Sequence, residues 1–235
     1  MCIQAKAEYT KKEGMMEMKK VDKKNIRIAL CLLLAFVLWT VAVCCVDIQA
    51  VGPQGSVVGF STFNVFVHEL TGVNMTLYTV TDWLGLVPLM LVLVFAVLGL
   101  VQWIRRGHLL KVDYSILALG VFYIIVLGLF VFFETFVVNY RPVLIEGRLE
   151  ASYPSSTTML VMCVMPTAIM QLGYRVKSTA LRRIFTLAIV TFTLFMVIGR
   201  LVSGVHWCSD IIGGALFSAG LVMTYYSVVN IGLKR

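Results

Sequence analysis

Charged residues are scarce in this sequence. Asp, Glu, Lys and Arg together make up 14% of the 235 residues, whereas 60% of the residues are hydrophobic and the mean hydropathy is +0.91. This composition excludes an ordinary soluble globular protein, which carries charges on about a quarter of its residues. We therefore expect an integral membrane protein.

The cysteines and carboxylates lack the patterns of a metal site. No cysteines are paired at the spacing of a zinc ribbon, and they do not form a framework of loop cysteines, so we interpret them as small apolar side chains. The acidic residues do not form a cluster that could hold magnesium. The sequence thus predicts neither a bound metal nor a cofactor. The six cysteines are Cys2, Cys31, Cys44, Cys45, Cys163 and Cys208.

Uncharged stretches long enough to cross roughly 30 Å of hydrocarbon occur six times. Each stretch is continuously apolar rather than alternating, which indicates helices and not the strands of a barrel. The fifth is short, but arginines at its ends can extend toward the membrane interfaces. The sequence predicts an all-α integral membrane bundle of six transmembrane helices. Their ranges are 28–46, 83–104, 114–133, 151–174, 184–199 and 211–233.

A lysine-rich segment precedes the first apolar run, as it does in a secretory signal peptide. The apolar core of this run is too long for a signal peptide, so an uncleaved first helix is the better interpretation. We expect two parts in the chain, a basic cytoplasmic tail at residues 1–24 and a membrane domain at residues 25–235. The tail mixes Lys and Glu, which favours a solvated or frayed helical extension.

The positions of Lys and Arg predict the orientation in the membrane. The net charge is +8, and of the 20 basic residues only Arg141, Arg148 and Arg200 fall in segments on the side opposite to the tail. Because basic residues concentrate on the cytoplasmic side, both termini are predicted in the cytoplasm. The excess of Lys and Arg is thus explained by the orientation of the protein in the membrane, and we expect no nucleic-acid partner. We expect the protein in the cell (plasma) membrane.

Polar residues of chemically useful types gather at the predicted outer ends of the helices, in the motif segments 134–158 and 199–210. In the second segment, His206 and Asp210 are four residues apart. If this stretch is helical, both lie on one face, and the carboxylate could hold one imidazole nitrogen while the other faces a substrate. The alternative is that His206 and Asp210 only cap the start of the last helix.

A helix start is predicted where a proline is followed by three hydroxyl residues, Ser155, Ser156 and Thr157. The free backbone N–H groups and the positive dipole end of such a start bind phosphate readily. Arg141 and Arg200 would add forked donors that match phosphoryl oxygens. The alternative is that Ser155 is only an N-cap and that the two arginines contact lipid headgroups.

Taken together, these motifs resemble those of the type 2 phosphatidic acid phosphatase and vanadium haloperoxidase superfamily, in its six-helix membrane branch of lipid phosphatases. The family patterns run Lys-x6-Arg-Pro, Pro-Ser-Gly-His and Ser-Arg-x5-His-x3-Asp. The order and spacing are similar here, from about the third to the sixth predicted helix. The third pattern is the most specific match, through Arg200, His206 and Asp210.

The resemblance implies a role for each motif residue. His206 would attack phosphorus and carry a phosphohistidine intermediate, and Asp210 would orient and stabilise it. Arg141 and Arg200 would hold the phosphoryl oxygens, and the hydroxyl and backbone N–H groups of residues 155–157 would complete the cradle. No metal would be needed, because the arginines and amides neutralise the charge.

Three positions depart from the family patterns. Glu134 stands where the family has Lys, Thr157 where it has a second His that protonates the leaving group, and Gly199 where it has Ser. We expect a membrane lipid phosphatase acting on lipid phosphates or polyprenyl diphosphates at the extracytoplasmic face. The alternative is a non-catalytic relative that binds or transports phosphorylated lipids.

Overall fold

The computed structural model describes the backbone of residues 2–233 and the side chains of residues 23–233. Within this range the chain is helical, with eight α-helices, two short 3₁₀ helices and no strand. In chain order they are α1 (Cys2–Cys45), η1 (Pro53–Gly55), α2 (Ser61–Thr71), α3 (Met75–Leu84), α4 (Leu86–Arg106), η2 (Leu109–Lys111), α5 (Tyr114–Thr135), α6 (Ser156–Arg175), α7 (Thr179–Val202) and α8 (Cys208–Leu233).

Six segments of the described chain are long and apolar enough to cross a membrane, which confirms the predicted all-α bundle. They are Lys23–Cys45 within α1, Met75–Arg106 formed by α3 and α4, and the whole of α5, α6, α7 and α8. The second segment begins earlier than residue 83, because α3 continues into α4 through Gly85. α7 extends beyond residues 184–199 at both ends, because the helix continues through the charged residues that hydropathy leaves out.

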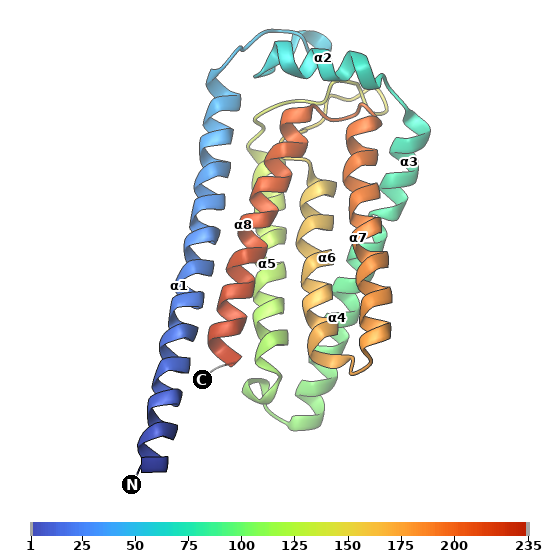
Figure 1. Ribbon diagram of the computed structural model, residues 1–235. Coiled ribbons are helices and arrows are strands. Elements are labelled where there is room, and N and C mark those ends of the chain that lie inside the picture. Colours follow the sequence, from blue (N-terminus) through green and yellow to red (C-terminus); the bar gives the residue numbers. More distant parts are fainter. Residues whose placement is uncertain (1, 234–235) are drawn as a thin grey trace.

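α8 lies at the centre of the bundle. It packs against α1, α5, α6 and α7, while α4 packs against α5 and α6 (Figure 1). The first residues of α1 and the last residues of α8 lie at one end of the bundle (Figure 1). α2 lies across the opposite end, which we call the α2 end.

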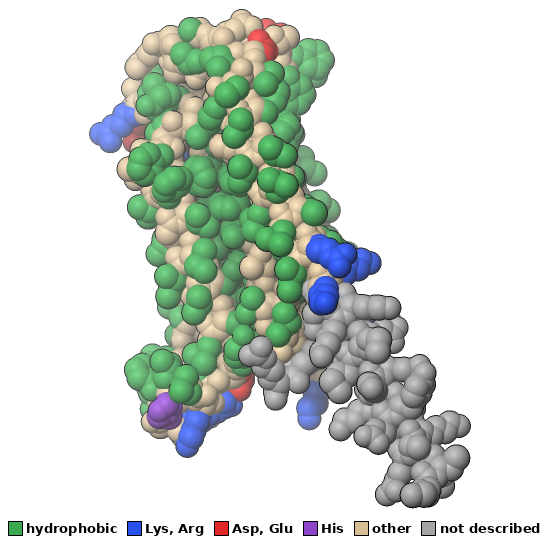
Figure 2. Space-filling model, turned by 90° about the vertical axis from the view of Figure 1, so that its left-hand side faces the viewer, with side chains coloured by type: hydrophobic (Ala, Val, Ile, Leu, Met, Phe, Trp, Pro, Cys, Tyr) green, Lys and Arg blue, Asp and Glu red, His purple; other side chains and the backbone are tan. Residues whose placement is uncertain are grey.

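The sides of the bundle are apolar. Figure 2 shows hydrophobic side chains along the length of one face, with most of its Lys and Arg side chains in the half away from α2. The tail is helical and continuous with the first span, since α1 starts at Cys2. These surfaces fit an integral membrane protein.

Two close approaches bring the ends of the helices together at the α2 end. A Cβ on Gly213 of α8 would lie 2.6 Å from the Tyr153 ring, so the glycine lets the segment before α6 pack directly on α8. Asn64 of α2 donates to Ser209 Oγ at 2.8 Å and accepts from the Ser209 N–H at 3.0 Å. These contacts fix the start of α8 beneath α2.

Candidate active site

His206 lies at the α2 end, in the turn between α7 and α8, and its side chain is buried. α8 begins at Cys208, so His206 precedes the helix, and the helical condition under which it would share a face with Asp210 is not met. Ser152 instead stands between the two side chains. Its hydroxyl donates to Asp210 Oδ2 at 2.6 Å and lies 2.9 Å from His206 Nδ1.

The hydrogen bonds of Ser152 assign the imidazole tautomer. A serine hydroxyl has one proton, and this proton is donated to the carboxylate, which only accepts. The Ser152 oxygen therefore accepts from an Nδ1–H of His206. The lone pair is then on Nε2, which lies 3.4 Å from Arg141 Nη1. This arrangement presents a nucleophilic nitrogen beside a cationic donor.

The surroundings of His206 favour its neutral form. Burial is the main cause that lowers its pKa well below the usual 6.5, and the positive charges of Arg141 and Arg200 lower it further. Near neutral pH the imidazole is therefore uncharged, as a nucleophile must be.

Asp210 is a buried carboxylate held by several donors. In addition to Ser152, its oxygens accept from the Trp207 N–H at 3.1 Å, Asn139 Nδ2 at 3.3 Å and Ser209 Oγ at 3.3 Å. This set satisfies a charge that would otherwise be costly to bury. The alternative considered above, capping of the α8 start, therefore also applies to Asp210. The same carboxylate accepts from the Trp207 N–H before α8 and contacts the imidazole indirectly, through Ser152.

Ser152 and Asn139 were not predicted from the sequence. The chain reverses between them, and antiparallel contacts join Tyr140 to Ala151 and the Ser152 N–H to Asn139 O at 2.9 Å. Asn139 and Ser152 both lie inside the motif segment 134–158, but neither is a defined position of one of the family patterns. Only the geometry of this reversal places both residues on Asp210.

The two predicted phosphate-binding arginines lie near each other. The guanidinium carbons of Arg141 and Arg200 lie 5.9 Å and 5.0 Å from the centre of the Tyr78 ring, which belongs to α3. Arg141 Nε lies 3.1 Å from Glu150 Oε2. The structure thus places Arg141 beside the imidazole and Arg200 on the same tyrosine ring as Arg141, an arrangement in which phosphoryl oxygens could accept from both.

Arg200 is almost fully buried but only partly satisfied. Its Nη2 donates to Asp82 Oδ1 at 2.7 Å and to Thr157 Oγ1 at 2.6 Å. Its Nε and Nη1 are buried without a hydrogen-bond partner among residues 23–233. Buried polar groups are paired as a rule, so two free guanidinium nitrogens point to an anionic ligand.

A sequence model of the PAP2 superfamily matches residues 89–232. The chain belongs to the PAP2 superfamily. Its structure is similar to a crystal structure described as the first transmembrane PAP2 type phosphatidylglycerolphosphate phosphatase from Bacillus subtilis, with a TM-score of 0.57 and 17% sequence identity. That match covers 88% of this chain and 95% of the other, whereas no curated protein sequence matches. Both findings confirm the resemblance, and PAP2 membership supports a phosphatase of the lipid phosphatase kind.

The PAP2 helix start at residues 155–157 is present. α6 begins at Ser156, and Ser155 is its N-cap, since Ser155 Oγ accepts from the Thr158 N–H at 3.5 Å. The backbone N–H of Ser155 donates to the backbone oxygen of Asp210 at 3.1 Å. Ser155 thus has the capping role of the alternative interpretation, while Thr157 contacts Arg200 directly.

Close packing explains why Gly199 stands where PAP2 proteins have Ser. A Cβ on Gly199 would lie 2.8 Å from Thr81 Cγ2. α3 therefore packs closely on α7 at this point, and the close approach also places Tyr78 and Asp82 beside Arg200. Both of these residues lie outside the matched range of the PAP2 superfamily.

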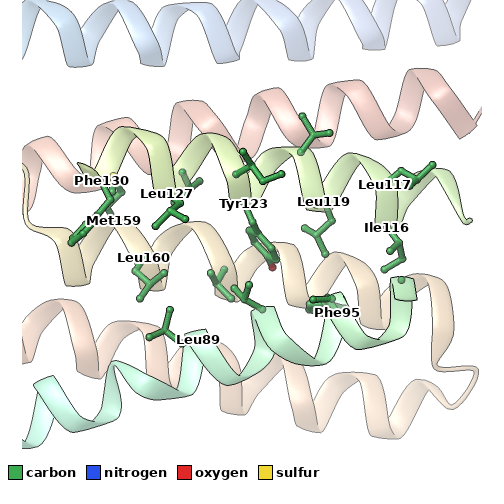
Figure 3. Close-up of a pocket in the computed structure, with 18 of the residues that line it drawn as sticks. Leu89, Phe95, Ile116, Leu117, Leu119, Tyr123, Leu127, Phe130, Met159 and Leu160 are labelled. Carbon is green, nitrogen blue, oxygen red and sulfur yellow. The ribbon is translucent and has the colours of Figure 1, made fainter. Parts of the chain in front are cut away.

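An apolar cavity of about 930 Å³ adjoins these groups between α4, α5 and α6. Figure 3 shows Leu89 and Phe95 of α4 facing Leu119 and Leu127 of α5. Among the lining residues, Asp82 of α3 and Ser156 and Thr157 of α6 lie toward the α2 end. The cavity thus runs from Asp82 and Thr157, which both contact Arg200, into the apolar part of the bundle.

Proposed function

We propose that this PAP2 protein hydrolyses phosphorylated membrane lipids, either lipid phosphates or polyprenyl diphosphates, through a phosphohistidine intermediate. The observation that carries the proposal is the His206 ring. Ser152 holds its protonated nitrogen, and its free Nε2 lies beside Arg141.

The reaction would proceed in two displacements. The Nε2 lone pair attacks phosphorus, the bond from phosphorus to the lipid oxygen breaks, and that oxygen takes its proton from solvent water, because Thr157 supplies none. Water then attacks the phosphohistidine, which releases inorganic phosphate and restores the neutral imidazole. Arg141 and Arg200 stabilise the charge on the phosphoryl oxygens in both steps, and the amides of Ser156 and Thr157 add to the cradle. Asp210 stabilises the imidazolium-like phosphohistidine through Ser152.

The cavity supports a lipid rather than a soluble substrate. Its lining is predominantly apolar, and Asp82, Ser156 and Thr157 supply polar groups at one end. A hydrocarbon chain in this cavity would place its phosphate beside Arg200. Burial of such a chain supplies binding free energy in proportion to the apolar area removed from water.

The proposed substrate side is extracytoplasmic. The site lies at the α2 end, whereas the first residues of α1 and the last residues of α8 lie at the other end (Figure 1). Most of the Lys and Arg residues fall in segments assigned to the end of the bundle that carries the first residues of α1. We therefore propose that this end faces the cytoplasm. The phosphate would then be presented from the outer leaflet of the cell membrane.

Phosphate release by the purified protein in detergent tests this function. We expect release from phosphatidic acid or a polyprenyl diphosphate, its loss in His206→Ala, and no change in the control His108→Ala, whose imidazole lies on the exposed α4–α5 connection. A trapped phosphoenzyme stable in base and labile in acid would identify the intermediate. Full turnover by His206→Ala would overturn the mechanism, and lipid binding without turnover would favour the non-catalytic alternative.

A further inference from the structure

α3 supplies a carboxylate to an arginine of the phosphate site. Tyr78 and Asp82 are four residues apart on this helix and thus share one face, which is turned to Arg200. Asp82 Oδ1 lies 2.7 Å from Arg200 Nη2. The arginine side chain is 2% exposed and the aspartate side chain 60%, so the buried cation is fixed and the carboxylate is at the edge of the site.

The position of Asp82 on the guanidinium limits how an anion can bind there. A guanidinium offers two forks, Nε with Nη2 and Nη1 with Nη2, so Nη2 belongs to both. In Arg200 this shared nitrogen is held by Asp82 and Thr157, whereas Nε and Nη1 are the buried nitrogens without a partner. An anion that binds bidentately must therefore take Nη2 from one of its present acceptors.

We infer that Asp82 is a specificity-determining counter-ion, which the terminal phosphate of a substrate displaces and which phosphodiester lipids do not. The inference rests on the proposed function, because it takes Arg200 as a phosphate ligand. It concerns the most abundant competitors in any bilayer, since a phosphodiester headgroup has phosphate oxygens of similar shape but only one negative charge on the phosphate.

Charge distinguishes the two kinds of ligand. When a phosphodiester replaces the carboxylate on Arg200, one negative charge replaces another, and the attraction to the arginines changes little. A terminal phosphate carries up to two negative charges, so its attraction to Arg141 and Arg200 at equal distance is about twice that of a monoanion. Only the dianion therefore gains enough to offset the loss of the pair with Asp82.

The location of Asp82 makes this selection effective for lipids. Asp82 lines the apolar cavity together with Ser156 and Thr157. A lipid whose chain lies in the cavity brings its phosphate to the arginines past this carboxylate. Phosphodiester lipids that enter the cavity would then meet an Arg200 whose positive charge is already paired with Asp82.

Two soluble anions test the inference without any need for turnover. Inorganic phosphate at pH 8 is mainly a dianion, and dimethyl phosphate is a monoanion with the same core. Binding to the full-length protein in detergent can be measured from the ligand-induced rise in the unfolding temperature. We expect the wild type to bind phosphate but not dimethyl phosphate. Asp82→Asn should bind phosphate about fivefold more tightly, on the order of the coupling in a half-exposed ion pair, and should also bind dimethyl phosphate.

The controls separate charge from structure. Asp82→Glu retains the charge and should discriminate as the wild type does. Glu69→Gln removes a negative charge from an exposed position on α2 and should change neither affinity. If Asp82→Asn does not fold, Asp82→Ser offers the same loss of charge with a smaller side chain.

Four outcomes would contradict the inference. Weaker phosphate binding by Asp82→Asn would show that Asp82 only positions Arg200. Dimethyl phosphate binding by the wild type, or an unchanged preference in Asp82→Asn, would show that the carboxylate does not select. Absence of phosphate binding in every variant would overturn the phosphate site itself. The expected binding pattern without phosphate release from any lipid would instead overturn the proposed hydrolysis and leave the role of Asp82 standing.

Discussion

Ser152 Oγ lies 2.6 Å from Asp210 Oδ2, and through this hydrogen bond a buried carboxylate acts on an imidazole that it does not touch. The serine oxygen can accept from His206 Nδ1 because its own proton is directed to the carboxylate. A three-membered chain of carboxylate, hydroxyl and imidazole thus replaces a direct pair. Loss of the hydroxyl should disconnect its two ends.

Ser152→Ala should therefore lower kcat by about 10²- to 10⁴-fold, the range typical of a lost proton-transfer or orienting group. The reason is that Nδ1 loses its acceptor and the ring loses its tautomer and orientation. Steady-state kinetics should show a smaller effect on KM. Ser209→Ala is the matched control, because Ser209 also contacts Asp210 but not His206, and its loss of kcat should be smaller. Equal losses in both variants would contradict the bridging role.

The sequence was sufficient for the six spans and for the PAP2 motifs, because long apolar runs and fixed spacings are local properties. His206, Arg141 and Arg200 come together as the resemblance implied. Ser152 escaped prediction because its partner Asp210 is distant in sequence and the two meet only through a chain reversal between α5 and α6. The pairing of Arg200 with Asp82 escaped for the same reason.

The pH dependence of the rate should reflect the lowered pKa of His206. Burial and two arginine charges hold this pKa well below 6.5, so the neutral nucleophile persists as the pH falls through 6.5 and is lost only well below it. Arg141→Gln removes one of these charges and should raise the pKa. The acid limb of kcat/KM should then move to higher pH relative to the wild type.

The wild type and Arg141→Gln should be compared on the same substrate, so that ionisation of the substrate affects the two pH profiles equally. A limb at the same pH in both proteins would show that the charge of Arg141 does not act on the imidazole. The acid limb of kcat/KM reports the free enzyme, which is the state that the structure describes.

Gly199→Ser, which restores the residue common in PAP2 proteins, should destabilise this protein. Its Cβ would lie 2.8 Å from Thr81 Cγ2, and overpacking of this kind costs about 1–3 kcal/mol. Thermal unfolding in detergent should show a lower midpoint. Thr81→Ser removes the opposing methyl group but keeps the hydroxyl bond to Leu77 O, so the double variant should recover most of the loss. A double variant no more stable than Gly199→Ser would contradict the predicted clash.

The proposed orientation can be tested with two matched leucines. Leu144 and Leu110 are both exposed, at 39% and 79%, and lie at the α2 end and in the α4–α5 connection. In a background without the native cysteines, Leu144→Cys should react with an impermeant thiol reagent from outside intact cells, whereas Leu110→Cys should be protected. The reverse result would overturn both the topology and the outer-leaflet substrate.

Thr157 connects the site to the choice of substrate. It stands where PAP2 relatives have the histidine that protonates the leaving group, and its Oγ1 accepts from Arg200 Nη2 at 2.6 Å. A threonine does not release a proton near neutral pH. General acid assistance is typically worth about 10²- to 10⁴-fold, and it matters most when the leaving oxygen is a strongly basic alkoxide.

This chain should therefore cleave polyprenyl diphosphates in preference to phosphatidic acid, because the leaving group of a diphosphate is a phosphate monoester, a far weaker base. Thr157→His restores an acid at the edge of the cavity. It should raise the cleavage of phosphatidic acid much more than that of the diphosphate. Phosphate release from both substrates by both proteins decides the matter. Equal gains would show that leaving-group protonation does not separate the two substrates, and inactivity in all four combinations would favour a PAP2 relative that binds phosphorylated lipids without cleaving them.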